Sequence, residues 1–333
     1  MDAAVRARRL VDGYQVSQAI HVAVVLGLPD RVAGGPRSAD ELASATGSHP
    51  RSLYRLMRAL ATVGVFHELP GQRFQATELS DALRSDTPAP ISGWAAFAGR
   101  PPIWQAWGSL LHSVRTGENA FEHVHGCDMW AYWAGRPEEG EAFDSAMTST
   151  AGVVSSAVLD AYDFGRFREI VDVGGGRGGF LAAVLARWPE VRGVVLDLPH
   201  VVAGAGELLA GQGVADRCRV APGSFFDEVP TGADAYLLKS VMHNWPDEKA
   251  VEILRRCRAA MDGHATVLLV ERVMRGPNED PDSAFVDINM LVGPGGQERT
   301  QTEYADLLDA AGLRLVRVVP SSSVMSVIES VPA

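Results

Sequence analysis

A glycine-rich turn in the second half of the chain constrains the fold more than any other feature. Five glycines occupy six consecutive positions in Gly174-Gly175-Gly176-Arg177-Gly178-Gly179. The apolar run Ile170-Val171-Asp172-Val173 precedes them, and an amphipathic stretch from Phe180 to Arg187 follows. Glycine lets the backbone turn sharply and lets a ligand lie against it. The pattern therefore predicts a strand, a ligand-binding loop and a helix in direct succession.

Short apolar runs alternate with amphipathic segments from residue 168 onward. Such alternation predicts a doubly wound, mostly parallel α/β sheet. The last two runs lie close together in the sequence, which predicts one antiparallel strand near the C-terminus. We expect seven strands, at 170–173, 193–197, 219–221, 235–239, 266–270, 313–319 and 324–328.

The first 85 residues show the order helix, turn, helix, hairpin, which is typical of a winged helix. Ser38 is expected to cap the first helix of this motif, Gly47 to end it and Ser48 to start the next helix. A hairpin is expected around Pro70-Gly71. Two interpretations are open, DNA binding through Arg51, Arg55 and Arg58, and a dimerisation module, which we favour.

Composition excludes several classes of protein. The chain has 333 residues and a net charge of −11, which disfavours binding to a phosphate backbone. Its three cysteines have no CxxC spacing, so we expect neither a disulfide framework nor a zinc site, and a reducing cytoplasmic location. We find no signal peptide and no apolar run of about 18 residues, and expect no membrane partner.

Two acidic residues indicate the kind of cofactor. Asp197 closes the second expected strand, where an acid accepts hydrogen bonds from ribose hydroxyls. This position suits both NAD and S-adenosylmethionine. Asp172 stands just before the glycines, where it would repel a pyrophosphate but suit an ammonium or sulfonium group. Charge complementarity therefore favours S-adenosylmethionine.

Five motifs in order now identify a family. They are Val171-Asp172-Val173-Gly174-Gly175-Gly176, Leu196-Asp197-Leu198-Pro199, Gly223-Ser224-Phe225-Phe226, the run from Leu238 to Glu248, and Gly295-Gly296-Gln297-Glu298-Arg299-Thr300. Together they resemble the S-adenosylmethionine-dependent small-molecule O-methyltransferases, which include plant caffeate and flavonoid enzymes and bacterial antibiotic-tailoring enzymes. The resemblance covers nearly the whole chain.

The resemblance implies a class I, Rossmann-like methyltransferase fold with an N-terminal winged-helix dimerisation domain. It implies a homodimer, with a dimerisation domain at 1–105 and a catalytic domain at 106–333, whose residues 106–165 form bridging helices. The expected cofactor is S-adenosyl-L-methionine, with S-adenosyl-L-homocysteine as product and no metal. The expected substrate is a hydroxyl group of an aromatic or polyketide-like small molecule.

The resemblance also implies residue roles. His243 is the expected general base, flanked by Glu271 and Glu298. The expected cofactor-binding residues are Asp172, Gly174, Gly176, Asp197, Leu198, Ser224, Phe225, Lys239 and Ser240. The expected acceptor-pocket residues are Phe143, Met147, Trp245, Asn289 and Met290. Many relatives carry Asp in place of Ser224, and serine still accepts a hydrogen bond, but without charge.

The placement of His243 supports the base role independently. It follows an expected strand, and ligands of doubly wound sheets bind beyond the carboxyl ends of the strands. Glu271 ends the next strand, so its carboxylate can orient the imidazole. A cluster of His123, His125 and Cys127 could share one face of an extended segment as metal ligands, but we favour solvated loop histidines.

Other functions compete with methyl transfer. A family member can bind the cofactor yet catalyse hydroxylation, decarboxylation or cyclisation, and the presence of His243, Glu271 and Glu298 argues against this. A nicotinamide oxidoreductase is opposed by Asp172. A DNA-binding regulator would use the first 85 residues, and we expect no nucleic-acid partner.

Overall fold

The computed structural model describes residues 2–87 and 90–333, without the side chains of residues 148 and 150–153. The chain folds into two compact units. One comprises residues 1–104 and 136–152, and the other residues 105–135 and 153–333. Helices α8 (Pro101–Gly108) and α12 (Pro137–Ala161) have residues in both units. Among the described residues, no helix combines the length and the apolar character that crossing a membrane requires.

The first unit contains the winged helix. Its strands form a small antiparallel sheet in the order β1-β3-β2, and the hairpin predicted around Gly71 joins β2 to β3. The bounds are α1 (Ala3–Val11), α2 (Gly13–Val25), α3 (Leu28–Ala33), β1 (Arg37–Ser38), α4 (Ala39–Thr46), α5 (Pro50–Thr62), β2 (Phe66–Leu69), β3 (Arg73–Ala76), α6 (Glu78–Ala82) and α7 (Ser92–Ala98).

The helix boundaries of this motif follow the prediction with one correction. Ser38 forms a capping box with Glu41, and Gly47 ends α4 in the left-handed conformation. Ser48 does not start α5, contrary to the prediction. Its N–H donates to the Ala43 carbonyl and so completes the end of α4, while the His49 side chain caps α5.

The second unit is built on a doubly wound sheet with strand order β10-β11-β8-β7-β4-β5-β6. The predicted sheet is confirmed, and β11 is the antiparallel strand, pairing with β8 and β10. The strands are β4 (Glu169–Val173), β5 (Arg192–Asp197), β6 (Cys218–Pro222), β7 (Ala235–Lys239), β8 (Thr266–Met274), β10 (Leu313–Pro320) and β11 (Met325–Pro332). A two-residue strand, β9 (Arg299–Thr300), pairs in parallel with the end of β8.

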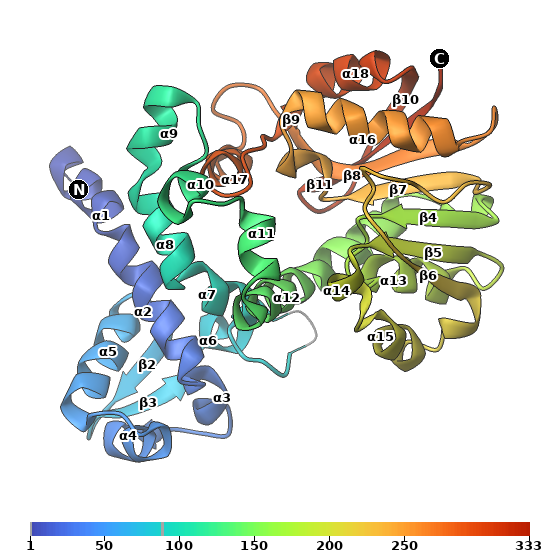
Figure 1. The fold of residues 1–333 in the computed structure, drawn as a ribbon. Helices are drawn as coiled ribbons and strands as arrows, with labels where there is room; N and C mark the ends of the chain where they lie inside the picture. Colours follow the sequence, from blue (N-terminus) through green and yellow to red (C-terminus); the bar gives the residue numbers. More distant parts are fainter. Residues whose placement is uncertain (1, 88–89) are drawn as a thin grey trace. The chain divides into compact units, whose positions relative to one another are not determined.

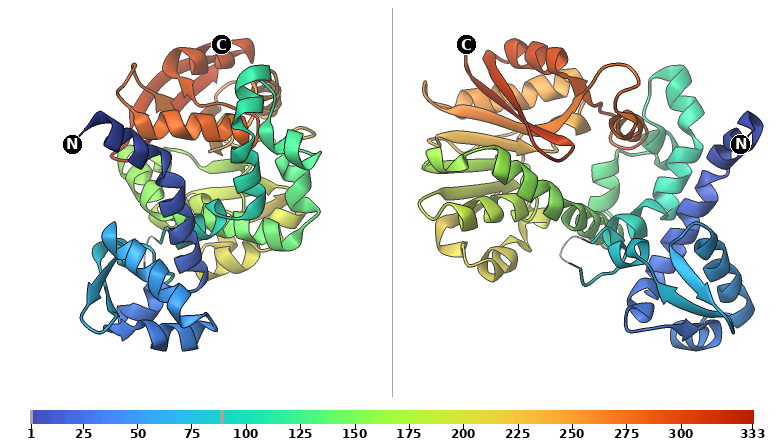
Figure 2. Two further views of the ribbon diagram at one scale, coloured as in Figure 1. Left: turned by 90° about the vertical axis from the view of Figure 1, so that its left-hand side faces the viewer. Right: turned by 180° about the vertical axis from the view of Figure 1, so that it is seen from behind.

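Helices connect these strands and cover both faces of the sheet (Figures 1 and 2). The helices that follow the start of the sheet are α13 (Gly179–Arg187), α14 (Pro199–Val202), α15 (Ala205–Gly211), η2 (Ala215–Arg217), η3 (Met242–Asn244), α16 (Asp247–Ala260), α17 (Pro281–Val292) and α18 (Gln301–Ala310). The unit also contains α9 (Leu110–Thr116), α10 (Ala120–His125), α11 (Met129–Ala134) and η1 (Phe164–Arg166), which precede the first strand of the sheet. The predicted helix after the glycine loop is α13, and a capping box of Thr300 and Glu303 starts α18.

Alternation along the strands gives each face its own core. Val171 and Leu238 pack under α16 and α18, whereas Ile170 and Leu237 pack under α13, α15 and the end of α12. Because side chains alternate with period two, Asp172 points to the α13 face. All parallel strands end at the same edge, which we call the carboxyl edge.

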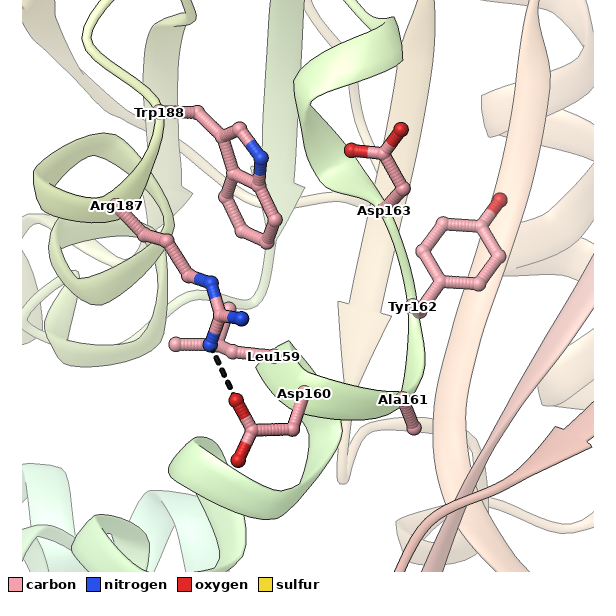
Figure 3. A pocket seen from close by; sticks show the side chains of 7 residues that line it. All are labelled: Leu159, Asp160, Ala161, Tyr162, Asp163, Arg187 and Trp188. Carbon is pink, nitrogen blue, oxygen red and sulfur yellow. Dashed lines mark hydrogen bonds and ion pairs between the residues drawn. The ribbon is translucent and has the colours of Figure 1, made fainter.

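A surface pocket marks the opposite edge of the sheet. Its lining residues come from the end of α12, the segment before η1 and the end of α13 (Figure 3). Arg187 forms an ion pair with Asp160 there, and Trp188 covers the backbone of Gly165. Since α13 starts at the carboxyl edge and runs back across the sheet, this pocket lies at the edge where doubly wound sheets do not bind ligands.

A buried carboxylate on β11 ties three segments of the second unit together. Glu329 accepts hydrogen bonds from the Tyr162 hydroxyl at 2.9 Å, Arg166 Nη2 at 2.6 Å and Arg317 Nε at 2.9 Å. Burial raises the pKa of Glu329, but these three hydrogen bonds outweigh it and hold the pKa below its usual value.

Replacing Glu329 with Gln is expected to lower the free energy of unfolding by about 2 kcal/mol at pH 7, because two arginines lose a charged acceptor. A depressed carboxyl pKa stabilises the fold above the ordinary glutamate pKa. The difference from the wild type should therefore stay constant above that value and narrow only below it. Urea unfolding at several pH values measures this. Asp160→Asn, which breaks an exposed pair, should cost less than about 1 kcal/mol, and an equal loss in both variants would contradict the account.

Candidate active site

The glycine loop adopts a conformation that other residues resist. Gly174, Gly176 and Gly178 have φ angles of 73°, 62° and 82°, in the left-handed region. A Cβ on Gly174 would lie 2.9 Å from Val241 Cγ2 and 3.3 Å from Phe225 Cε1. The loop therefore depends on glycine both for its turns and for close packing.

The loop after β5 is fixed to the glycine loop through Asp197. Its Oδ2 accepts the N–H of Gly176 at 2.8 Å, and its Oδ1 accepts the N–H of Leu198 at 2.7 Å. The N–H of Gly223 donates to the Asp197 carbonyl, which brings the turn after β6 alongside. In that turn Ser224 Oγ accepts the N–H of Phe226 at 3.2 Å. Three loops thus meet at the carboxyl edge.

A buried acid, Asp172, and a partly buried base, Lys239, lie on the same face of the sheet. Asp172 pairs with Leu237 in the β4–β7 ladder, so Lys239, two residues further along β7, lies on the same face. Burial raises the pKa of Asp172 to about 7, although Lys239 opposes the shift. Burial also lowers the pKa of Lys239, against the attraction of Asp172 and Glu271. Within the described part of the chain, Asp172 Oδ1 has no hydrogen-bond partner.

The turn after β7 places His243 next to the carboxylates of Glu298 and Glu271. His243 Nδ1 lies 2.8 Å from Glu298 Oε1 and 3.8 Å from Glu271 Oε2. Glu271 is fully buried, and its Oε1 accepts the N–H groups of Val241 and Met242, both at 2.8 Å. Ser240, which starts the turn, has a φ of 55°, a strained value for a non-glycine residue.

These contacts determine the chemistry available to the imidazole. Burial lowers the pKa of His243, but the charge of Glu271 and the hydrogen bond to Glu298 outweigh it and raise the pKa above its ordinary value. Burial raises the pKa of Glu271. With Nδ1 directed at two carboxylates, its proton is held there, and Nε2 is left as the nitrogen that can accept another proton.

The same three side chains could also ligate a metal. His243, Glu271 and Glu298 form the one such group found among the described residues, with ligand atoms within 4.8 Å of one another. The expectation of a metal-free site stays a prediction. The segment containing His123 and His125 is helix α10, not an extended strand or a loop. The His123 ring stacks on His112 at 3.7 Å, and the His125 ring packs against Phe121.

The residues expected to line the acceptor pocket lie in both units. In the second unit, Trp245 packs edge-on against Phe226, Asn289 Oδ1 accepts the indole N–H of Trp107 at 3.1 Å, and Met290 is buried on α17. In the first unit, the ring centroids of Phe143 and Phe97 lie 5.6 Å apart, and Met147 is 38% exposed. Their grouping around an acceptor stays a prediction.

Sequence reasoning missed the supports of the histidine turn. Arg299 is completely buried and donates to the Met242 and Trp245 carbonyls, and Asp287 accepts the N–H of Glu298. A signal existed in Gly295-Gly296, because paired glycines before charged residues indicate a close approach of two backbones. Their partner segment could not be inferred from the sequence.

The residues at the carboxyl edge fit the cofactor that the resemblance implies. The loop at Gly174 and Gly176 presents backbone without side chains, the Asp197 carboxylate lies beside this loop at the end of β5, and Asp172 has an unpaired oxygen on the strand that precedes the loop. A Cβ on Gly175 would lie 2.7 Å from that carboxyl group. This donor set suits a cationic ligand that carries a ribose and no phosphate.

Family profiles match nearly the whole chain. A profile described as an O-methyltransferase dimerisation domain matches residues 8–86, and one described as an O-methyltransferase domain matches residues 107–314.

Similar proteins include bacterial methyltransferases of antibiotic pathways. The chain is 41% identical to the phenazine O-methyltransferase PhzM of Lysobacter antibioticus, over 97% of this chain and 95% of that protein. It is 43% identical to a mitomycin biosynthesis 6-O-methyltransferase of Streptomyces lavendulae, over 93% of this chain and 89% of that protein. The chain also resembles CalO1, a methyltransferase of calicheamicin biosynthesis whose crystal structure has S-adenosyl-L-homocysteine bound. The two sequences are 37% identical, and the structures superpose over the full length of both chains with a TM-score of 0.86.

One relative bears a different activity in its name. The aclacinomycin 10-hydroxylase RdmB of Streptomyces purpurascens is 36% identical over 92% of this chain and 83% of that protein. Similarity of this degree therefore includes proteins named for a reaction other than methyl transfer.

The pKa of Asp172 predicts how its replacement changes stability with pH. The folded protein keeps a proton on Asp172 between about pH 4 and 7 and the unfolded chain does not, so wild-type stability falls as the pH rises through this window. Asp172→Asn lacks that penalty. The free energy of unfolding of this variant should match that of the wild type near pH 4 and exceed it by roughly 2 kcal/mol at pH 8. Each unit of difference between the folded and unfolded pKa of Asp172 can contribute at most about 1.4 kcal/mol, and the expected gain lies within that bound.

Thermal and urea unfolding at pH 4, 6 and 8 measure this trend. Asp197→Asn is the matched control, because Asp197 already accepts two amide N–H groups, and its replacement should lower stability by about 1 kcal/mol. A gain for Asp172→Asn that does not change with pH would show that the carboxyl ionises normally.

Proposed function

Because the chain belongs to the S-adenosyl-L-methionine-dependent O-methyltransferases, we propose that it methylates a hydroxyl group of an aromatic or polyketide-like small molecule, with His243 as general base. The observation that carries the proposal is the 2.8 Å contact between His243 Nδ1 and Glu298 Oε1. It orients an imidazole whose other nitrogen can accept a proton. The name of this family and the chemistry of the residues agree on the reaction class.

The cofactor, when bound, supplies a methyl group already activated by a sulfonium centre. The protein's remaining tasks are therefore to orient the acceptor and to remove its proton. Gly174, Gly176, Asp197, Leu198 and Ser224 would hold the methionine, ribose and adenine parts of the donor. Phe225, Lys239 and Ser240 complete this proposed set. Asp172 would face the cationic groups.

His243 Nε2 would take the hydroxyl proton as the acceptor oxygen takes the methyl group. The positive charge that develops on the imidazole lies next to Glu298 and Glu271, which stabilise it. The same carboxylates stabilise the resting imidazolium, which raises the histidine pKa. Deprotonation therefore requires a pH above the ordinary histidine value.

The acceptor site is proposed to contain Phe143, Met147, Trp245, Asn289 and Met290. Aromatic and thioether side chains suit a flat apolar ring, and the Asn289 amide can hydrogen-bond a polar substituent. Such a lining selects a shape and leaves the identity of the molecule open.

We also propose a cytoplasmic homodimer formed through residues 1–105. Large apolar side chains at the start of the chain are exposed: Leu10 is 83% exposed, Val11 72% and Tyr14 57%. Exposed apolar surface of this kind is typical of an interface, and a dimeric molar mass by light scattering tests it.

A non-methylating reaction is the second candidate, favoured by the relative named as a hydroxylase. It predicts cofactor binding without transfer of the methyl group. Retention of the His243–Glu298 contact favours methyl transfer.

Replacing His243 with Ala is expected to lower kcat for methyl transfer by 10²- to 10⁴-fold, the usual contribution of a general base. Wild-type kcat should rise with pH through an apparent pKa above 6.5, because the raised pKa of His243 keeps the imidazole protonated below it. The measurement is transfer of a labelled methyl group to hydroxylated aromatic acceptors, with S-adenosyl-L-homocysteine formation followed in parallel.

Calorimetric titration with S-adenosyl-L-homocysteine should give similar affinity for wild type and variant, and NAD should not bind. His264→Ala is the matched control, since His264 is exposed just before β8 begins and should leave kcat unchanged. Full activity of the His243→Ala variant would refute the proposed role of His243 as general base. Binding of the cofactor without formation of S-adenosyl-L-homocysteine or of a methylated acceptor would favour the second candidate.

A further inference from the structure

One short segment of the chain holds the turn that carries His243. The segment Gly296–Arg299, which we call the positioning segment, runs from the loop after α17 into β9. Gln297 Nε2 donates to Asp247 Oδ1 at 2.9 Å, and Glu298 Oε1 lies 2.8 Å from His243 Nδ1. Consecutive residues thus contact the turn and the start of α16.

Arg299 makes the most extensive contacts of the four. Nη1 donates to the Met242 carbonyl at 2.9 Å, and Nη2 donates to the Trp245 carbonyl at 2.8 Å. Nε and Nη2 donate to Asp247 Oδ1 at 3.0 and 2.8 Å, and Nη1 also reaches the Gln297 carbonyl at 3.4 Å. All five N–H donors of the guanidinium are therefore used, although its side chain is 0% exposed.

Two of the three carbonyls that Arg299 binds lie on either side of His243 in the sequence. Met242 precedes it directly, and Trp245 follows two residues later. Only a planar, forked group can bind both carbonyls and the Asp247 carboxylate together. The backbone of Arg299 is itself fixed, because Arg299 pairs with Val273 of β8, the strand that carries Glu271.

Gly296 allows this approach. A Cβ at this position would lie 2.1 Å from the His243 carbonyl oxygen, 2.5 Å from the Asn244 carbonyl carbon and 2.5 Å from the Trp245 nitrogen. These neighbours are backbone atoms, which cannot swing aside as a flexible side chain can. Any larger residue must push the positioning segment and the histidine turn apart.

We propose that Arg299 is a positioning residue for the reaction: it fixes the backbone on both sides of His243, and Gly296 permits the contact. The inference rests on the proposed role of His243 as the base. Stability alone does not account for the arrangement, because burying the guanidinium costs desolvation energy and Asp247, with which it forms its ion pair, is 63% exposed. What the guanidinium adds is a defined distance between the turn and Glu298.

The test is Arg299→Lys, which keeps the positive charge but loses the fork. We expect kcat to fall about 10- to 100-fold, as for a catalytic group displaced by about 1 Å. The acceptor KM and the affinity for S-adenosyl-L-homocysteine should change by less than about threefold. The acidic limb of the pH–kcat profile should move to lower pH, because the histidine loses its close contact with Glu298.

A merely structural role would not move that limb. Glu298→Gln should shift it in the same direction, and the double variant should lose less activity than the product of the two single losses. Arg217→Lys is the matched control: Arg217 also donates to backbone carbonyls, those of Leu185, Trp188 and Val191 at the end of α13. It should lower thermal stability while leaving kcat and the pH profile unchanged.

Gly296→Ala provides an independent test, because it removes no polar group. The same fall in kcat and the same shift of the limb are expected. This variant decides the outcome if Arg299→Lys does not bind S-adenosyl-L-homocysteine and so has not folded. Wild-type kcat and pH profile in a folded Arg299→Lys or Gly296→Ala variant would overturn the inference.

The two proposals fail in different ways. If His243→Ala keeps full activity, the base assignment falls and the inference falls with it. If His243→Ala is inactive while Arg299→Lys and Gly296→Ala behave as wild type, only the positioning role is wrong.

Discussion

The buried carboxylate of Glu271 is the contact on which the arrangement of the site depends. It sits near the end of β8 with no exposure, beside the end of β7, because Lys239 and Val270 are opposite one another in the parallel ladder. A buried carboxylate needs hydrogen-bond donors, and the N–H groups of Val241 and Met242 supply two, both to Oε1. The first residues after β7 are therefore bent back over the end of β8, and this bend directs His243 toward Glu298.

At the carboxyl edge, buried acidic side chains outnumber the basic side chains that could neutralise them. Asp172, Glu271 and Glu298 are all buried there, whereas the charge of Arg299 is already paired with Asp247 and Lys239 is weakened by burial. Acids that lack full compensation raise their own pKa values and destabilise the empty protein. If these acids face the donor as proposed, their charge is expected to favour positively charged S-adenosyl-L-methionine over S-adenosyl-L-homocysteine, whose sulfur is neutral.

The sequence was sufficient for features set by local chemistry or by periodicity. The seven strands, the glycine loop, the helix cap at Ser38 and the antiparallel strand near the C-terminus are all found. Glu271 could be placed near His243 because adjacent parallel strands end at one edge. The cap of α5 at His49 was missed because serine is itself a preferred capping residue. In the structure, the N–H of Ser48 instead completes the end of α4.

Contacts between distant loops could not be predicted from the sequence. Nothing local indicates that Arg299 is buried, since arginine is usually exposed, or that its partners are carbonyls more than fifty residues earlier. Residues with recognisable motifs supply the chemistry, and residues without a motif fix their distances. The proposed base His243 and its partners Glu271 and Glu298 all belong to the second unit, whereas Phe143 and Met147, which the resemblance assigns to the acceptor, belong to the first. Substitutions of Phe143 or Met147 are therefore expected to leave the contacts of His243 with Glu298 and Glu271 intact.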